Sequence, residues 1–371
     1  MNKLENQVVL LLAGSRFRDV LRLGDTFLSI GDLDTATNIY KLLLSAPDFA
    51  LVSTCRLALV ERTRKGLRRS DTVAQDAGWV LVWQKSKELE GSFFRQLLGD
   101  VTIVKEVDNF DYGSNKSLYT YHAKKMIVFD DVIRNQSAVD YYCRAATVCD
   151  RIVLFHQSDE AYEDHREIYP LVDLVFRNYW MPLGEANVRY LPLGPAARCE
   201  CTGPREGSAA TISWPDRKFL WSFAGDVKNK PHREVALRAF SGLRRGFTHQ
   251  VQGFHSTEKL GAENYCAVLR ESVFSLCPSG GINPETFRLY ESLDAGAIPL
   301  MLFRERNYIN HLFGGSSPLL AFENWAEARN FVERVESDAI ELGMIRNAIR
   351  EWCTLWRLRC KHMVSKGIVE L

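Results

Sequence analysis

Short apolar runs separated by longer amphipathic segments dominate the chain from about residue 80 onward. The first five runs cover residues 80–83, 101–104, 126–129, 152–155 and 188–191. Parallel strands that are buried on both faces of a sheet have this pattern, with helices in the intervening segments. We therefore predict a first Rossmann-like α/β domain over residues 71–205.

A second group of apolar runs follows a stretch rich in Gly, Pro, Ala and Ser, which indicates an interdomain linker. The strands predicted after this linker cover residues 219–223, 273–277 and 297–302. We therefore predict a second Rossmann-like domain over residues 206–345. Residues 346–371 are predicted to form a C-terminal helix. In other proteins with two Rossmann-like domains such a helix often crosses back to the first domain, and by this analogy we expect the same here.

Residues 1–70 have apolar positions at helical spacing. One segment resembles a single tetratricopeptide repeat, with matches at Leu23, Gly24, Phe27, Gly31, Ala36 and Tyr40. A stable solenoid needs about three or more repeats. The segment is therefore either a helical hairpin docked on the main body or a module that binds a protein partner.

Residues 272–302 predict a strand, a loop, a helix and a second strand, which together form a β-α-β unit. The loop contains Ser279, Gly280 and Gly281. Asn283 is the predicted N-cap of the helix, with Pro284 at its first position and Glu285 in its first turn, and Gly296 ends the helix. Free backbone N–H groups at such a helix N-terminus suit a phosphate or pyrophosphate.

Arg288 and Glu291 lie three residues apart on this predicted helix and therefore share one face. An arginine can hold a diphosphate through two hydrogen bonds, and a carboxylate can accept hydrogen bonds from ribose hydroxyls. The alternative is an exposed helical ion pair with no role in binding. The spacing alone leaves both interpretations open.

The stretch CPSGGINPETFRLYESLDAGAIPLML resembles the C-terminal signature of the exostosin-type glycosyltransferases, which include the ribitol xylosyltransferase group. The matching positions are Cys277, Pro278, Gly280 or Gly281, Arg288, Tyr290, Glu291, Gly296, Ile298 and Pro299. This resemblance implies a GT-B type fold, in which two Rossmann-like domains face a cleft. It also implies a nucleotide-sugar donor that binds to the second domain.

The strand predicted at 219–223 is followed by Gly225 and by Pro231, which can start a helix. Arg233 then lies in the first turn of that helix. The family has a similar arginine at the first turn of its nucleotide domain, so the resemblance implies that Arg233 is a second contact to the pyrophosphate.

The loop after the strand at 152–155 carries His156, Asp159 and Glu160, at the edge where parallel α/β sheets bind ligands. The segment also resembles one in bacterial exostosin-like proteins, through these three residues and Arg177, Asn178, Tyr179, Pro192, Leu193 and Gly194. Transfer needs a base for the acceptor hydroxyl. Asp159 or Glu160 is the predicted base, with His156 behind them; the alternatives are a merely polar loop, or the Asp130-Asp131 pair.

Charge, hydropathy and cysteine content limit which partners, cellular locations and cofactors the protein can have. The net charge of +1 argues against a general nucleic-acid binder, and no apolar run approaches the length of a transmembrane segment. The nine cysteines are an odd number in apolar contexts, which predicts reduced thiols and a cytoplasmic protein, at most peripheral at the inner face of the membrane. Because Asp130-Asp131 lacks an Asp-x-Asp pattern, we predict no metal and no other cofactor.

Together these features predict an inverting glycosyltransferase that moves a sugar from a nucleotide diphosphate donor to a hydroxyl group. The resemblance implies a UDP-sugar donor, and a surface glycan such as a capsular polysaccharide, or a polyol phosphate, as acceptor. The main alternative is a non-catalytic nucleotide-sugar-binding scaffold that acts through residues 1–70. A P-loop kinase is disfavoured, because the sequence has no Gly-x-x-x-x-Gly-Lys-Ser/Thr motif.

Overall fold

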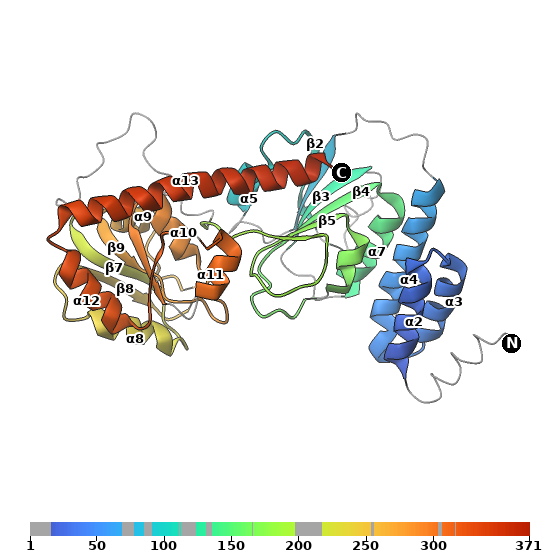
Figure 1. Ribbon diagram of the computed structural model, residues 1–371, viewed down its shortest axis with the longest axis horizontal. Helices are drawn as coiled ribbons and strands as arrows, with labels where there is room; N and C mark the ends of the chain where they lie inside the picture. Colours follow the sequence, from blue (N-terminus) through green and yellow to red (C-terminus); the bar gives the residue numbers. More distant parts are fainter. Residues whose placement is uncertain are drawn as a thin grey trace.

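The computed structural model describes residues 16–68, 78–84, 91–110, 112, 124–130, 136–164, 166–196, 217–253, 256–302, 306–315 and 317–371. Figure 1 shows N-terminal helices, a first α/β domain and a second α/β domain side by side, with one long C-terminal helix along both domains. The predicted architecture of two Rossmann-like domains with an N-terminal helical segment is confirmed.

The N-terminal helices are α2 (Phe17–Ser29), α3 (Leu33–Leu43) and α4 (Pro47–Arg68). Helices α2 and α3 pack so closely that a Cβ atom on Gly24 would lie 2.5 Å from the ring of Tyr40. Helix α4 contacts the first domain through α7 and η1. These contacts agree with a helical segment docked on the main body, whereas a tetratricopeptide-like role in partner binding stays a prediction.

The first domain contains a six-stranded parallel sheet in the order β2-β1-β3-β4-β5-β6. Its strands are β1 (Trp79–Gln84), β2 (Ile103–Phe110), β3 (Lys125–Asp130), β4 (Arg151–His156), β5 (Leu174–Arg177) and β6 (Val188–Tyr190), and its helices are α5 (Gly91–Leu98), α7 (Gln136–Val148) and η1 (Arg166–Leu171). The apolar runs predicted all of these strands except β5. Sequence reasoning missed β5 because it is four residues long and ends in an arginine.

The second domain contains a five-stranded parallel sheet in the order β11-β10-β9-β7-β8. Its strands are β7 (Phe219–Asp226), β8 (Gly246–Val251), β9 (Ser272–Leu276), β10 (Ile298–Leu302) and β11 (Leu320–Phe322), and its helices are α8 (Pro231–Phe240), α9 (Ala262–Arg270), α10 (Phe287–Ala295), α11 (Arg306–Phe313) and α12 (Trp325–Val335). The edge strand β8 is mostly exposed, so it has no buried run that the sequence could reveal.

Helix α10 begins at Phe287, with Thr286 at its N-cap, and not at Pro284 as predicted. Asn283 and Glu285 are buried and bind groups of the first domain. The Asn283 side chain donates to the Glu160 carbonyl at 2.7 Å, and Glu285 accepts from the Leu193 N–H at 2.6 Å. These polar side chains satisfy groups across the domain interface instead of capping the helix. Gly296 does end the helix, in a left-handed conformation with φ +70°.

Helix α13 (Ala339–Val369) begins before the predicted position 346 and covers both domains, as its length along the top of Figure 1 shows. It contacts α10 and α12 of the second domain and α5 and β5 of the first. The rings of Trp356 and Tyr290 stack with centroids 5.8 Å apart. The expected crossing of the C-terminal helix back to the first domain is therefore present.

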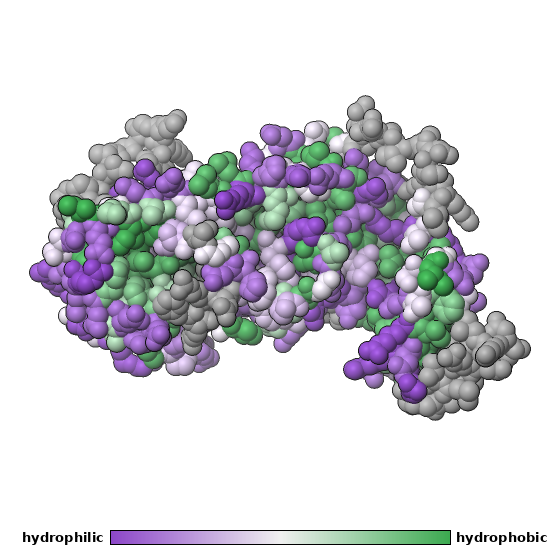
Figure 2. Space-filling model, viewed as in Figure 1, coloured by the Kyte–Doolittle hydropathy of each residue, from purple (hydrophilic) through white to green (hydrophobic). Residues whose placement is uncertain are grey.

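The visible surface mixes hydrophilic and hydrophobic residues, as Figure 2 shows. None of the helices in the described ranges combines the length and the hydropathy that crossing a membrane requires. Six described cysteines are free and buried, but Cys266 is disulfide-bonded. The prediction of reduced thiols throughout is wrong at Cys266, because spacing in the sequence does not reveal which cysteines meet in the fold.

Candidate active site

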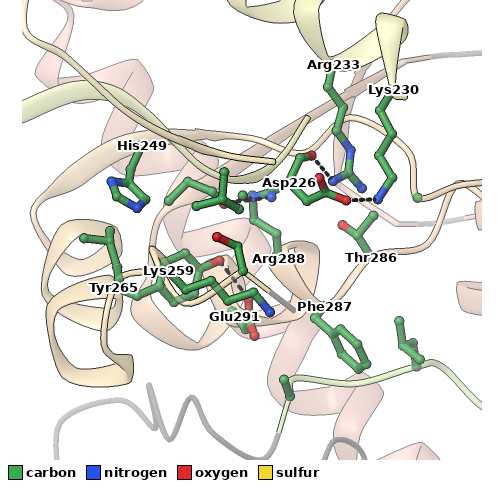
Figure 3. Close-up of a pocket in the computed structure, with 18 of the residues that line it drawn as sticks. Asp226, Lys230, Arg233, His249, Lys259, Tyr265, Thr286, Phe287, Arg288 and Glu291 are labelled. Carbon is green, nitrogen blue, oxygen red and sulfur yellow. Dashed lines mark hydrogen bonds and ion pairs between the residues drawn. The ribbon is translucent and has the colours of Figure 1, made fainter. Parts of the chain in front are cut away.

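A cavity of about 540 Å³ lies at the carboxyl ends of the second domain's strands, where Figure 3 shows polar side chains from several elements pointing together. Glu160, Tyr179, Leu193 and Ala196 of the first domain also line it. Open α/β sheets bind ligands at this edge. The cavity is therefore an interdomain site in which groups of both domains can meet one ligand.

Arg288 lines this cavity from α10. Its Nε and Nη2 donate to the Ala224 carbonyl at 3.1 and 2.8 Å, and its guanidinium carbon lies 4.3 Å from the ring centroid of Phe223. The buried Nη1 has no hydrogen-bond partner among the described residues. A Cβ on Gly225 would lie 2.1 Å from Nη2, so a larger residue there would displace the guanidinium. The guanidinium is thus fixed on one side and has N–H groups left for a ligand.

Thr286, the N-cap residue of α10, lines the same cavity. Its buried Oγ1 also has no hydrogen-bond partner in the described part of the chain. Buried polar groups are nearly always paired, so two unpaired ones on residues of one cavity wall mark a position where a polar ligand could bind. Because a helix N-terminus carries a partial positive charge, an anionic oxygen suits this position.

Arg233 is the second residue predicted to contact the pyrophosphate, and its guanidinium donates hydrogen bonds to backbone carbonyls. Nε and Nη2 donate to the Ser279 carbonyl at 3.1 and 3.0 Å, and Nη1 donates to the Asp226 carbonyl at 2.7 Å. Burial, together with the positive charge of Arg288, lowers the pKa of Arg233 to about 10. A bound anion would offset this cost of holding two buried guanidinium groups close together.

Glu291 lies at the cavity wall on the same helix as Arg288, as Figure 3 shows. Its side chain is 5% exposed, and Oε2 accepts from the Tyr265 hydroxyl at 2.7 Å. The alternative of an exposed ion pair between Arg288 and Glu291 is therefore wrong: both residues are buried, and the guanidinium bonds go to Ala224. The predicted shared face of the helix is real and lines the cavity.

The glycine-rich loop does not present its N–H groups to an open phosphate site. The N–H groups of Gly281, Ile282 and Asn283 donate to Oε1 of Glu160 at 2.7, 3.0 and 3.4 Å, and the N–H of Gly280 donates to the Asn283 carbonyl. Gly280 and Gly281 do line the cavity, but their N–H groups are already bonded within the protein, so their role as phosphate ligands stays a prediction. Since the helix starts only at Phe287, the loop binds a carboxylate of the first domain instead.

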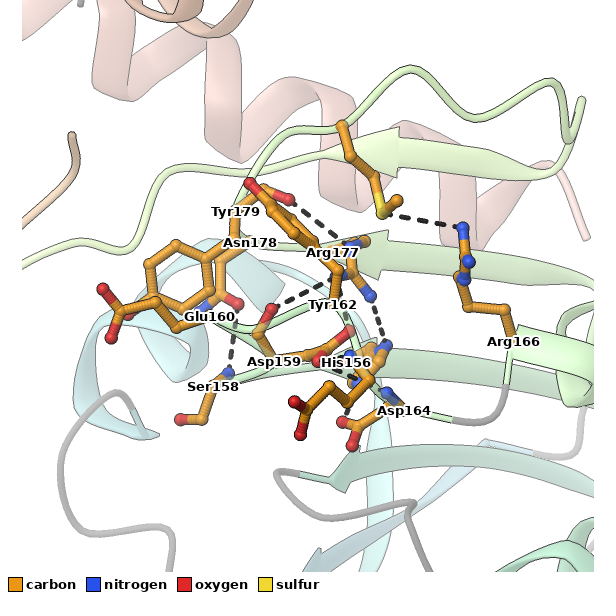
Figure 4. A network of polar contacts seen from close by, with 12 residues as sticks. His156, Ser158, Asp159, Glu160, Tyr162, Asp164, Arg166, Arg177, Asn178 and Tyr179 are labelled. Atoms are coloured by element: carbon orange, nitrogen blue, oxygen red, sulfur yellow. Dashed lines mark hydrogen bonds and ion pairs between the residues drawn. The ribbon is translucent and has the colours of Figure 1, made fainter. Parts of the chain in front are cut away.

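Asp159 and His156, two of the three predicted catalytic residues, lie in a buried network beneath the cavity wall (Figure 4). Arg177 Nη2 donates to Asp159 Oδ2 at 2.7 Å, and Arg177 Nη1 donates to His156 Nδ1 at 3.0 Å. His156 Nε2 donates to Asp164 at 2.8 Å. Neither Asp159 nor His156 lines the cavity. Asp159 follows the end of β4 and points into the domain, where it pairs with Arg177. The sequence does not reveal this pairing, so it predicts that Asp159 faces the ligand.

The donor atoms of His156, Asp159 and Asp164 lie within 4.8 Å of one another, which is close enough to hold a metal ion. The guanidinium of Arg177 already contacts two of these residues and supplies the positive charge. His156, Asp159 and Asp164 therefore do not fit a metal site, and independence from metal stays a prediction.

Asp130, the competing candidate for the base, is buried and accepts from the Tyr142 hydroxyl at 2.9 Å. Asp131 lies outside the described residues.

Glu285 is a functional residue of the interface that sequence reasoning missed. It is buried in the cavity wall and accepts from the Leu193 N–H, from the Tyr308 hydroxyl at 2.6 Å and from the Tyr290 hydroxyl. One carboxylate therefore links the first domain to α10 and α11. Its placement in a predicted first helical turn, where acids are common, hid this role.

Glu285 makes stability depend on pH. Burial raises the pKa of Glu285 above its ordinary value of 4.5. The folded protein therefore holds this proton more tightly than the unfolded chain, and the contribution of Glu285 to the free energy of unfolding falls as the pH rises through its folded pKa. The melting temperature of Glu285→Gln, relative to wild type, should increase between about pH 4 and pH 8. A difference that is constant with pH would contradict this assignment.

Comparison with known proteins identifies the second domain. The family described as the RXYLT1 C-terminal domain matches residues 205–366. The chain is 24% identical over 221 residues to ribitol-5-phosphate xylosyltransferase 1 of Danio rerio, which covers 54% of this chain and 49% of that protein. The chain thus spans about half the length of this curated relative.

Three solved structures of glycosyltransferases are among those with a similar backbone fold. They are an O-GlcNAc transferase of Thermobaculum terrenum (TM-score 0.46, 11% identity, 95% of this chain and 83% of that one), an α1,3-fucosyltransferase (0.47, 10%, 81% and 92%) and a DNA-modifying β-glucosyltransferase (0.46, 12%, 78% and 99%). At these TM-scores the likeness carries no argument about function. The match over residues 205–366 and the similarity to this xylosyltransferase support a glycosyltransferase related to the RXYLT1 proteins.

Proposed function

We propose that the protein is an inverting glycosyltransferase that uses a nucleotide diphosphate sugar. The observation that carries this proposal is that Arg288 and Thr286, which line one cavity with Glu291, each hold a buried polar atom without a hydrogen-bond partner among the described residues, Nη1 and Oγ1 respectively. They would bind the diphosphate, while Glu291 would accept hydrogen bonds from the ribose hydroxyls. Arg233 acts behind them by holding the Ser279 carbonyl and adding positive charge.

Glu160 is the proposed general base. It lines the cavity from the first domain, its Oε1 is fixed by the loop at 281–283, and its Oε2 accepts no hydrogen bond from the described residues. The acceptor hydroxyl would give its proton to Glu160 while its oxygen attacks the anomeric carbon. The bond from that carbon to the diphosphate breaks, and the diphosphate leaves with the electron pair, stabilised by Arg288.

The substrates follow from the relative. Since that protein is named ribitol-5-phosphate xylosyltransferase 1, we propose a hydroxyl of a polyol phosphate or surface glycan as acceptor. The proposed UDP-sugar donor is what the resemblance in the sequence implies. Cavity volume is compatible with a nucleotide sugar, because ligand pockets typically measure about 300–1,000 Å³. A location on the cytoplasmic side and independence from metal belong to the same proposal.

Thermal unfolding with UDP, GDP, CDP and ADP, each with and without EDTA, tests this proposal. A nucleotide at about one hundred times its dissociation constant stabilises the fold by ~2.7 kcal/mol. We expect a shift with UDP that EDTA does not change, followed by transfer from a UDP-sugar. Absence of any shift would favour the scaffold alternative and a search for partners of residues 1–70.

Replacement of Glu291 by alanine should weaken UDP binding. The loss of a charged hydrogen bond to the ribose should cost roughly 1.5–3 kcal/mol of binding free energy, which titration calorimetry can measure. Glu333→Ala is the matched control, because it removes an exposed glutamate bonded to Arg329 on α12. Equal UDP affinity in Glu291→Ala and wild type would remove Glu291 from the donor site.

A further inference from the structure

Backbone strain is concentrated around Glu160. Ser158, Tyr162 and Tyr179 have φ values of 63°, 59° and 56°, and they are three of the five non-glycine residues with positive φ in the described ranges. Such conformations are rare for L-residues and persist where the surrounding structure enforces them. Two of them flank Glu160 on the loop after β4, and the third lines the cavity opposite that loop.

A buried ion pair between Arg177 and Asp159 holds the loop at 157–164 in this conformation. Arg177, at the end of β5, donates to Asp159, and the two side chains are 0% and 1% exposed. The other carboxylate oxygen of Asp159 accepts from the N–H groups of Glu163 and Asp164 at 2.9 and 3.4 Å, which curls the chain around it. The Ser158 N–H is held by the Asn178 side chain at 3.1 Å.

Asp159 and Glu160 are neighbours in the chain with opposite surroundings, as Figure 4 indicates. Asp159 points into the first domain to Arg177, whereas Glu160 reaches across the interface to Gly281. The Glu160 carbonyl also accepts from the Asn283 side chain. Fixing Asp159 therefore fixes the direction of Glu160. A loop free of the ion pair could relax its positive-φ residues and withdraw Glu160 from the cavity.

We propose that Asp159 and Arg177 are positioning residues that act through Glu160. Their ion pair holds the loop at 157–164 in the strained conformation that presents Glu160 to the N–H groups of residues 281–283 and leaves Oε2 facing the cavity. The catalytic part of this inference rests on the proposed function, whereas the positioning part is independent of it.

Amide hydrogen exchange tests the positioning itself. Asp159→Asn keeps an acceptor for the N–H groups of Glu163 and Asp164 but removes the charge that pairs with Arg177. We expect the Gly281 and Ile282 amides to exchange at least ten times faster in Asp159→Asn, as they should in Glu160→Ala, because opening of the contact becomes easier. Unchanged exchange at these amides would overturn the proposal. If Asp159→Asn fails to fold, Arg177→Gln, which removes the charge paired with Asp159, takes its place with the same expected result.

Asp173→Asn provides the matched control. Asp173 lies in the same domain as Asp159 and pairs with Arg62 of the N-terminal helix α4. It accepts from the Ile152 N–H at 2.7 Å, and among the described residues no hydrogen bond or ion pair joins its side chain to the loop at 157–164. This variant should lose stability without faster exchange at Gly281. Faster exchange there in Asp173→Asn would mean that any weakening of the domain releases Glu160, which contradicts a specific role of Asp159.

A double-mutant cycle tests the link to catalysis. Asp159→Asn should lower kcat for sugar transfer roughly tenfold or more with unchanged UDP affinity, and it should have no further effect in a Glu160→Ala background, because residues that act as a unit are not additive. An equal loss in both backgrounds would overturn action through Glu160. If wild type transfers no sugar from any donor, the proposed function fails, and the exchange experiment still decides whether Asp159 positions Glu160.

Discussion

Glu160→Gln will lower kcat for sugar transfer by roughly 10²- to 10⁴-fold, the usual contribution of a general base. Glutamine has nearly the same shape, and its carbonyl oxygen can still accept from the N–H groups of Gly281 and Ile282. The loop contact is therefore retained while the proton acceptor for the substrate hydroxyl is lost. Steady-state kinetics with a UDP-sugar and a calorimetric UDP titration measure the two effects separately.

Glu163→Gln is the control for this experiment. Glu163 is an exposed carboxylate on the same loop and is absent from the cavity wall. It should leave kcat and UDP affinity close to wild type. If Glu160→Gln retains wild-type kcat, Glu160 is not the base, and the role of the loop is then limited to joining the domains.

Removal of the Arg288 guanidinium should weaken donor binding as strongly as removal of the Glu291 carboxylate. Arg288→Met keeps the apolar stem against Phe223 but removes the charged donors, at an expected cost of roughly 1.5–3 kcal/mol, or about 10- to 150-fold in UDP affinity. Arg334→Met, on the exposed side of α12, is the control and should bind UDP as wild type does. Isothermal titration of UDP into each variant measures the change.

Gly225→Ala should reproduce much of this loss, because the added methyl group displaces the Arg288 guanidinium. A Cβ atom at position 225 would lie 2.1 Å from Arg288 Nη2, so the guanidinium has to leave the Ala224 carbonyl. A variant that binds UDP normally would show that the fixed orientation of Arg288 is not needed. Weaker binding in Arg288→Met but not in Gly225→Ala would mean that charge, not orientation, determines affinity.

The fold was largely predictable from the sequence because buried parallel strands leave continuous apolar runs. The runs at 126–129 and 152–155 correspond to β3 and β4 at the centre of the first sheet. Strands whose burial is partial or whose end is charged escape this pattern. The edge strands β8 and β11, which are only partly buried, and the short strand β5 with its buried Arg177 are the described strands that the sequence did not predict.

The candidate site was predictable where one helix carries its residues together. Arg288 and Glu291 share a face of α10 at fixed spacing, so the structure places both at the cavity. Contacts between distant segments were not predictable. The sequence offered Asp159 and Glu160 as equivalent candidates, and only the pairing of Asp159 with Arg177 separates an inward residue from one that faces the ligand.

The crossing of α13 from one domain to the other affects how the protein folds. Its last turns are part of the first domain's own core: Trp356, Cys360, Val364 and Ile368 belong to the cluster that contains Trp79 and Phe129. Gly367 approaches β5 so closely that a Cβ atom would lie 3.0 Å from Leu174. The core of the first domain is therefore completed by residues 356–368, which are synthesised among the last of the chain. Two architectural domains therefore form one cooperative folding unit, and a fragment ending at the interdomain linker would expose this core to solvent.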